Sequence, residues 1–96
     1  MLILVTYDVN TTTPEGEKRL RKVAQVCLNY GQRVQNSVFE CSVTPMQYES
    51  LRAALLAVAD LQSDSLRLYR LGQPREKILE SFGVQRDVDF HGPLVL

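Results

Sequence analysis

Few side chains in this sequence could do chemistry, and the first is a carboxylate at the end of an apolar segment. Asp8 lies near the end of the run Leu2 to Val9 (LILVTYDV), which gains polar groups only at its end. A carboxylate there can bind Mg²⁺, which takes only one or two carboxylates and keeps several of its waters. It can also cap the loop from Asn10 to Thr13 through backbone amides. The residues alone favour capping.

The densest group of positive charges could bind phosphate. This basic cluster consists of Lys18, Arg19, Arg21 and Lys22. Helical periodicity places Lys18, Arg21 and Lys22 on one face, where each phosphate contact would release condensed counterions. A solvated helix face is an equally good interpretation. Three further arginines could add a second basic strip: Arg67, Arg70 and Arg75.

The cysteines and the acidic end of the chain give weaker indications. Cys27 and Cys41 form no CxxC pair and the single His91 lies far from both, so a zinc site is poorly supported. We expect two reduced, buried thiols. Alternate positions near the end of the chain carry Asp87, Asp89 and His91, which could line one side of a strand as metal ligands. A solvated acidic tail explains these residues equally well.

The composition limits the classes of protein to consider. A chain of 96 residues has room for one domain, and 45% hydrophobic with 23% charged residues is typical of a soluble globular protein. Eleven basic and eleven acidic residues cancel, so any nucleic-acid contact must be local. No signal sequence or membrane span is recognisable. We therefore expect a cytoplasmic protein with no membrane partner.

Local signals predict a strand and then a helix in the first third of the chain. The apolar run 2–9 is typical of a central strand. Thr13 followed by Pro14 predicts a helix start, and Gly31 predicts its end. The apolar stripe of this helix is Leu20, Val23, Ala24, Cys27 and Leu28.

The middle of the chain predicts two strands, a second helix and a last strand. Residues 32–43 favour strand but break near Asn36, which indicates a turn or bulge. The T-x-x-Q pattern from Thr44 to Gln47 is a capping box. A turn at 62–64 precedes the half-exposed strand 65–71. The stripe of the second helix is Tyr48, Leu51, Leu55, Val58 and Ala59.

The order β-α-β-β-α-β predicts an α+β fold, a four-stranded antiparallel sheet with both helices on one face. We expect a single domain over 1–96, with a core over 1–71 and a C-terminal extension over 72–96. Ile78, Leu79 and Phe82 indicate a short helix in the extension. The apolar ending 93–96 (PLVL) needs a partner surface, either its own sheet or, as an additional C-terminal strand, the sheet edge of a second copy. Since so small a domain gains stability by association, we expect a homodimer.

Three short motifs resemble a known family when they are taken together at this spacing. They are Tyr7-Asp8-Val9, Gly31 followed by Arg33-Val34-Gln35, and Ser37-Val38-Phe39-Glu40. The combination is similar to the CRISPR-associated Cas-two (Cas2) family over residues 1–71, and the ending 92–96 (GPLVL) is similar to tails in part of that family. The resemblance implies a ferredoxin-like protomer in a symmetric dimer, with Asp8 of each protomer facing the other.

The resemblance also implies an activity. Members are described as metal-dependent endonucleases, and as the central piece of the complex that inserts new spacers into a CRISPR array with the Cas-one integrase, in antiviral defence. Phosphodiester hydrolysis of RNA or DNA needs neutralised phosphate charge and an activated water. On this interpretation Asp8 is both the catalytic residue and the metal ligand, and two Asp8 carboxylates share one Mg²⁺ or Mn²⁺.

Four further residues of these motifs are candidates for the site. Arg33, in the Gly-x-Arg segment, becomes a better single candidate for a phosphate contact than the members of the basic cluster. Tyr7 and Phe39 could stack on bases, although aromatic residues on strands usually pack in a core. Ser37 could orient water or phosphate, or serve as a turn residue.

Two other functions compete with an endonuclease. A non-catalytic nucleic-acid platform in the integration complex requires the dimer and the basic surface but no chemistry. A ferredoxin-like small-molecule regulator predicts a ligand-sized apolar pocket and no duplex binding, and no phosphate-cradling Gly-rich loop supports it.

Overall fold

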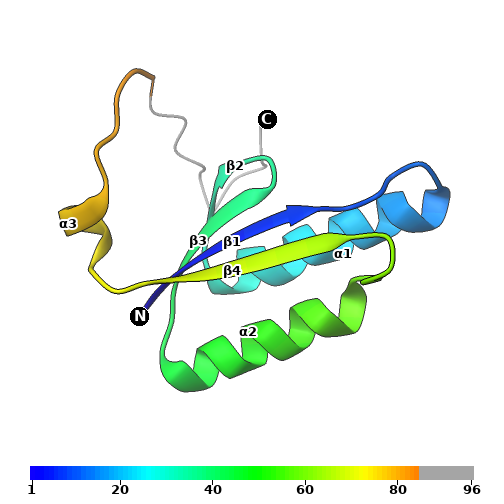
Figure 1. Cartoon of the computed structure of the whole chain (residues 1–96), viewed down its shortest axis with the longest axis horizontal. Helices are drawn as coiled ribbons and strands as arrows, with labels where there is room; N and C mark the ends of the chain where they lie inside the picture. Colours follow the sequence, from blue (N-terminus) through cyan, green and yellow to red (C-terminus); the bar gives the residue numbers. More distant parts are fainter. Residues whose placement is uncertain (85–96) are drawn as a thin grey trace.

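The computed structural model describes residues 1–84 of the 96, and Figure 1 shows the elements along them. They are strand β1 (Leu2–Asp8), helix α1 (Pro14–Tyr30), strands β2 (Gln32–Gln35) and β3 (Val38–Ser42), helix α2 (Pro45–Val58), strand β4 (Ser65–Leu71) and the one-turn helix α3 (Arg75–Ile78). The predicted element order is confirmed. The short helix of the extension ends at Ile78, so the expectation that Leu79 and Phe82 also belong to it is wrong. The predictions for Asp87, Asp89, His91 and the ending 93–96 lie outside the described residues.

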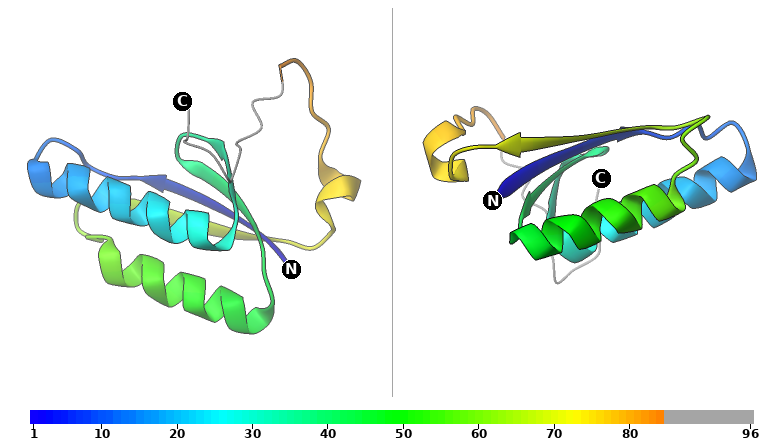
Figure 2. Two further views of the ribbon diagram at one scale, coloured as in Figure 1. Left: turned by 180° about the vertical axis from the view of Figure 1, so that it is seen from behind. Right: turned by 60° about the horizontal axis from the view of Figure 1, so that its bottom comes forward.

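The strands form one antiparallel sheet in the order β2-β3-β1-β4. Helices α1 and α2 lie together on one face of this sheet (Figure 2). The apolar first strand occupies the interior of the sheet, between β3 and β4, as its composition predicts. This is the expected α+β, ferredoxin-like arrangement. Within residues 1–84, none of the helices is both long and apolar enough to cross a bilayer.

The core lies between the sheet and the two helices. Its largest fully buried side chains are Phe39, Ile3, Leu51, Leu55, Val5, Val23, Cys27 and Cys41. Because side chains alternate between the two faces of a strand, burial of Ile3, Val5 and Tyr7 against the helices turns Asp8 to the other face. We call this other face of the sheet, which within residues 1–84 neither α1 nor α2 covers, the open face.

Both long helices begin where local capping chemistry predicts. The Thr13 hydroxyl accepts a hydrogen bond from Gly16 N at 3.1 Å. At the start of α2, Thr44 Oγ1 accepts from Gln47 N at 3.1 Å, and Gln47 Oε1 accepts from Thr44 N at 2.9 Å, completing the capping box. These bonds satisfy amides that the helix itself leaves without partners.

Gly31 ends α1, but its backbone is not left-handed. Its φ of −166° is extended, a conformation open to any residue. A Cβ atom at Gly31 would collide with the carbonyl oxygen of Glu40 and would lie 2.7 Å from Cα and Sγ of Cys41. Glycine is therefore required because α1 and β3 approach each other closely at this point.

Residues 72–76, which we call the strap, follow β4 and fold back toward the sheet. Arg75 Nε donates to Glu40 Oε1 at 2.7 Å, although the two residues are 35 positions apart. A groove of about 780 Å³ lies beside the strap, and its lining includes Leu2 and Ser42. The strap therefore lies near the start of β1, at the opposite end of that strand from Asp8.

Candidate active site and nucleic-acid interface

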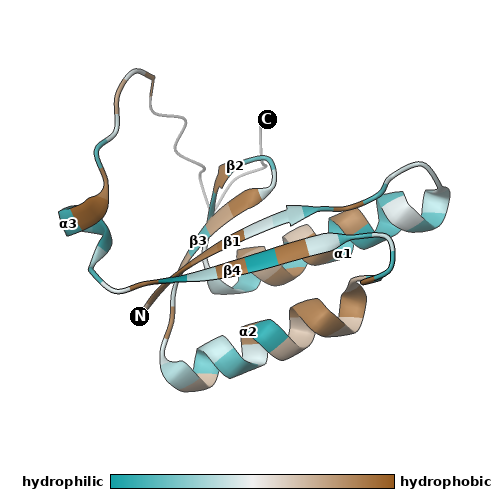
Figure 3. Cartoon of the chain, in the orientation of Figure 1, coloured by the Kyte–Doolittle hydropathy of each residue, from teal (hydrophilic) through white to brown (hydrophobic). Residues whose placement is uncertain are grey.

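Asp8 is exposed at the carboxyl end of β1, on the open face. The strand is apolar at its start and hydrophilic toward this end (Figure 3), and Asp8 pairs there with Ser65 of β4. In the described part of the chain, no group of three or more His, Cys, Asp or Glu side chains could hold a metal ion. Asp8 fits a metal only as a single anionic ligand, so a complete site needs ligands from a second copy, a substrate or water.

The loop after β1 is capped by side chains other than Asp8. Asn10 Oδ1 accepts from Thr12 N at 3.0 Å and from the Thr12 hydroxyl at 2.7 Å. Asn10 N donates to Asp64 Oδ1 at 3.1 Å. The interpretation of Asp8 as the cap of this loop is therefore wrong, and its carboxylate faces solvent instead.

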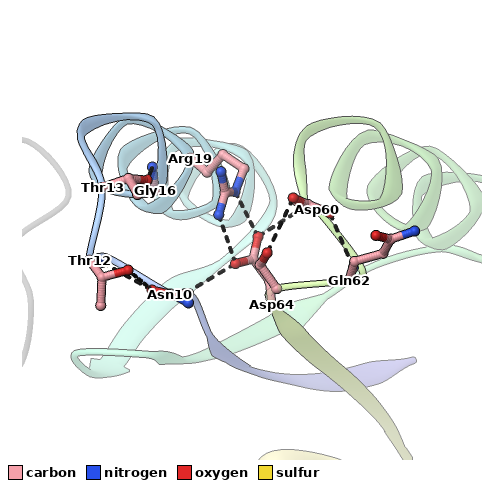
Figure 4. Close-up of polar contacts among 9 residues, drawn as sticks. Asn10, Thr12, Thr13, Gly16, Arg19, Asp60, Gln62 and Asp64 are labelled. Atoms are coloured by element: carbon pink, nitrogen blue, oxygen red, sulfur yellow. Dashed lines mark hydrogen bonds and ion pairs between the residues drawn. The ribbon is translucent and has the colours of Figure 1, made fainter.

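Asp64 joins three segments at the same end of the molecule (Figure 4). Its carboxylate accepts from Arg19 Nε at 2.9 Å, Arg19 Nη2 at 3.2 Å, Asn10 N at 3.1 Å and Asp60 N at 2.9 Å. The Asp64 side chain is fully buried and that of Arg19 is 20% exposed. The hydrogen bonds from Arg19 outweigh the burial and lower the pKa of Asp64 from 3.8 to about 2.

Sequence reasoning missed Asp64, placing it only in a turn. The residues that it binds in α1 and in the loop after β1 lie 45 and 54 positions away. No local pattern links them. Only the folding of β4 against β1 brings the strand start to the loop, so the sequence carried no usable signal for this contact.

Arg33, Phe39 and Tyr7 form a stack on the helix-facing side of the sheet. The Arg33 guanidinium carbon lies 5.1 Å from the Phe39 ring centroid, and the Phe39 and Tyr7 rings lie 6.1 Å apart, centroid to centroid, at an interplanar angle of 22°. Phe39 is fully buried, Tyr7 is 6% exposed and Arg33 is 9% exposed. All three residues pack within the protein, so a phosphate contact by Arg33 stays a prediction.

Burial changes the proton affinity of Tyr7 within this stack. Desolvation, reinforced by Cys27 and opposed by Arg33, raises the pKa of Tyr7 from 10.0 to about 12. Its hydroxyl donates to the carbonyl oxygen of Asn36 at 3.3 Å. Ser37 is half-buried in the same turn, and its carbonyl oxygen accepts from Tyr7 N at 3.1 Å. The turn and the end of β1 are thus held together.

The basic cluster divides into two parts. Lys18, Arg21 and Lys22 are exposed on α1, and among the described residues they form no ion pair. Arg19 is paired with Asp64. The exposed three lie on the outer side of α1, away from the sheet, and we call them the α1 basic face.

The other arginines do not form one strip. Arg67 lies on the open face and donates to the Tyr69 hydroxyl at 3.3 Å. Arg70 lies on the helix side, with its guanidinium carbon 5.2 Å from the Tyr48 ring centroid, and Arg75 is paired with Glu40. Strand alternation separates the first two.

The two thiols are buried, as predicted. Cys27 and Cys41 are both free and fully buried. Desolvation is the main cause that raises the pKa of Cys27 to about 12 and that of Cys41 to about 11. They therefore behave as core residues rather than as nucleophiles.

The chain is similar to known proteins over its whole length. The family model described as CRISPR associated protein Cas2 matches residues 1–78. A protein of Moorella thermoacetica named CRISPR-associated endoribonuclease Cas2 1 is 58% identical over 96 residues, covering 100% of both chains. One of Halalkalibacterium halodurans named CRISPR-associated endonuclease Cas2 is 52% identical over 95 residues, covering 99% of each.

A solved structure is similar to this chain in both fold and sequence. The crystal structure of Streptococcus pyogenes Cas2 at pH 6.5 superposes with a TM-score of 0.76 and 54% identity, covering 86% of this chain and 100% of that one. The family match, the full-length relatives and the shared fold agree with the motifs around Asp8, and on these grounds the chain belongs to the CRISPR-associated Cas2 family.

Proposed function

We propose that this protein is a metal-dependent endonuclease of CRISPR antiviral defence that hydrolyses phosphodiester bonds of RNA or DNA. The observation that carries the proposal is the position of Asp8, an exposed carboxylate at the end of the open face. The endoribonuclease and endonuclease names of full-length relatives support it. In spacer acquisition its expected partner is the Cas-one integrase.

The active unit that we propose is a symmetric homodimer formed through the open face. This face presents apolar side chains, of which Leu4 and Val38 are partly buried and Tyr69 is 42% exposed. A two-fold axis makes each patch meet its own copy. The axis would also bring together two Asp8 carboxylates, supplying the ligands that one protomer lacks.

Each protein group then has a definite task. The two Asp8 carboxylates would hold Mg²⁺ or Mn²⁺, which would neutralise phosphate charge and supply an activated water. The α1 basic face binds phosphates through Lys18, Arg21 and Lys22. The guanidinium of Arg19 is paired with Asp64. Arg19 therefore supports the α1 basic face by fixing α1 in place rather than by binding phosphate itself.

The test is the Asp8→Asn variant, which removes the anionic ligand and keeps the shape. It should lose metal-dependent cleavage of RNA and DNA and should remain a dimer. Glu49→Gln is the matched control, since Glu49 is an exposed carboxylate on α2 whose change should leave cleavage as in the wild type. Both variants must be purified identically to exclude a contaminating nuclease. Equal cleavage by Asp8→Asn and the wild type would remove Asp8 from the mechanism.

A non-catalytic nucleic-acid platform is the second candidate, and one observation favours it. The α1 basic face lies on the helix side of the molecule, whereas Asp8 lies on the open face, so duplex binding and cleavage need not share a surface. A purified protein that binds duplex DNA together with a Cas-one integrase, and does so equally well as Asp8→Asn, would support this role. Family membership favours both nucleic-acid roles over the small-molecule regulator.

A further inference from the structure

Every hydrogen-bond acceptor position of the Asp64 carboxylate has a donor. Two oxygens offer about four acceptor positions, and four donors occupy them, from Arg19, Asn10 and Asp60. Burying a charge is costly unless it is paired and hydrogen-bonded, and this one is fully buried. The arrangement is therefore a specific junction rather than an incidental surface ion pair.

This junction adjoins Asp8 on two sides. Ser65, the residue after Asp64, is the strand partner of Asp8. Asn10, two residues after Asp8, donates its amide to Asp64 Oδ1 at 3.1 Å. The backbone that carries Asp8 is thus held by pairing with β4 on one side and by the Asp64 carboxylate just beyond the strand end.

We propose that Asp64 is a positioning residue for Asp8. By holding the Asn10 amide and the start of β4 together, it fixes the direction in which β1 ends and so the placement of the Asp8 carboxylate. Arg19 acts through Asp64, because its two donors set the plane of that carboxylate. The inference rests on the proposed metal-binding role of Asp8 and adds the residues that orient it.

The first measurement concerns the backbone and needs no metal. Amide hydrogen exchange, read by NMR on the full chain, compares the wild type with Asp64→Asn. Asn10 N–H should lose protection about tenfold relative to the centre of α2, which is the loss expected for one hydrogen bond to a charged group. Unchanged protection of Asn10 would overturn the inference, whatever Asp8 does.

Asp60→Asn is the matched control. Asp60 lies in the same loop, but within residues 1–84 the hydrogen bonds that its carboxylate accepts come from Gln62 N at 3.1 Å and the Ser63 hydroxyl at 3.3 Å, and none comes from Asn10. It should leave Asn10 protection as in the wild type. If Asp64→Asn does not fold, Arg19→Lys is used as the test variant instead. Lysine keeps the positive charge but cannot donate the two parallel hydrogen bonds that Arg19 makes to Asp64.

The second measurement is Mn²⁺ affinity by electron paramagnetic resonance. Asp64→Asn should bind Mn²⁺ about tenfold more weakly, the lower end of the loss found when a group that orients a metal ligand is removed, since Asp64 acts on Asp8 through the Asn10 amide and the backbone of β1. Asp60→Asn should bind Mn²⁺ as the wild type does. If Asp8→Asn abolishes binding but Asp64→Asn equals the wild type, the inference is overturned while the proposed function stands. If Asp8→Asn binds like the wild type while Asn10 loses protection in Asp64→Asn, the hold on β1 is supported and the metal role of Asp8 is refuted.

Discussion

At the scale of single residues, the charged side chains divide into those that hold the fold and those that face solvent. Arg19 and Asp64 join α1 to the two loops beside Asp8, whereas Lys18, Arg21 and Lys22 are exposed. The four basic residues of one cluster thus have different roles. Their sequence alone could not separate them, since the partner of Arg19 lies 45 positions away.

The ionisation of Asp64 makes the free energy of unfolding depend on pH. Its pKa is lowered from 3.8 to about 2 in the folded protein, so the folded state binds fewer protons than the unfolded state. This contribution is complete above about pH 4 and is lost as the pH falls toward 2. Urea unfolding at a series of pH values should show the free energy of unfolding falling over this window. Asp64→Asn should flatten the fall, and parallel curves for the two proteins would contradict the assignment.

At the scale of elements, starts and ends were predictable where the signal is local. Both helix starts and the strand 65–71 lie where the sequence predicts them, because capping and alternation involve only neighbouring residues. The face of β2 was not predictable. The register shifts between Arg33 and Gln35, and since one extra residue reverses which face a side chain occupies, the burial of Arg33 followed from pairing with Phe39.

Gly31 and Gly72 each follow the end of an element, but close packing surrounds only Gly31 of the two. Gly31→Ala should destabilise the protein by about 1 to 3 kcal/mol, the usual cost of overpacking, because its Cβ would meet the backbone of Glu40 and Cys41. Gly72→Ala should change stability by less than about 0.5 kcal/mol, because nothing lies within 4 Å of its Cβ. Chemical denaturation of both variants measures this, and equal losses would show that close packing is not the reason for Gly31.

At the scale of the whole molecule, the sheet has one covered and one open face, while the net charge is zero. Attraction to nucleic acid must therefore come from local surfaces such as the α1 basic face. The fold class was predictable from the order of elements. The pairing of Arg19 with Asp64 and of Arg75 with Glu40 was not, because the partners lie 45 and 35 positions apart in the sequence.

Charge reversal on α1 tests the nucleic-acid surface. Arg21→Glu should weaken duplex binding and lower the slope of log affinity against log salt by about 0.9, the value for one lost phosphate contact. Lys77→Glu makes the same charge change on α3 and should leave the slope as in the wild type. Arg19 is unsuitable for this experiment because it is bound to Asp64. A salt slope unaffected by Arg21→Glu would leave α1 as a solvated face.

The proposed metal site, shared by the Asp8 carboxylates of two protomers, is tested most directly by counting ions per dimer. Native mass spectrometry in saturating Mn²⁺, with sedimentation to fix the oligomeric state, should find one ion for two chains, because each protomer contributes one carboxylate to a common site. Asp8→Asn should remain a dimer and lose that ion. A monomeric wild type, one ion in every chain, or an Asp8→Asn dimer that keeps its ion would contradict the account.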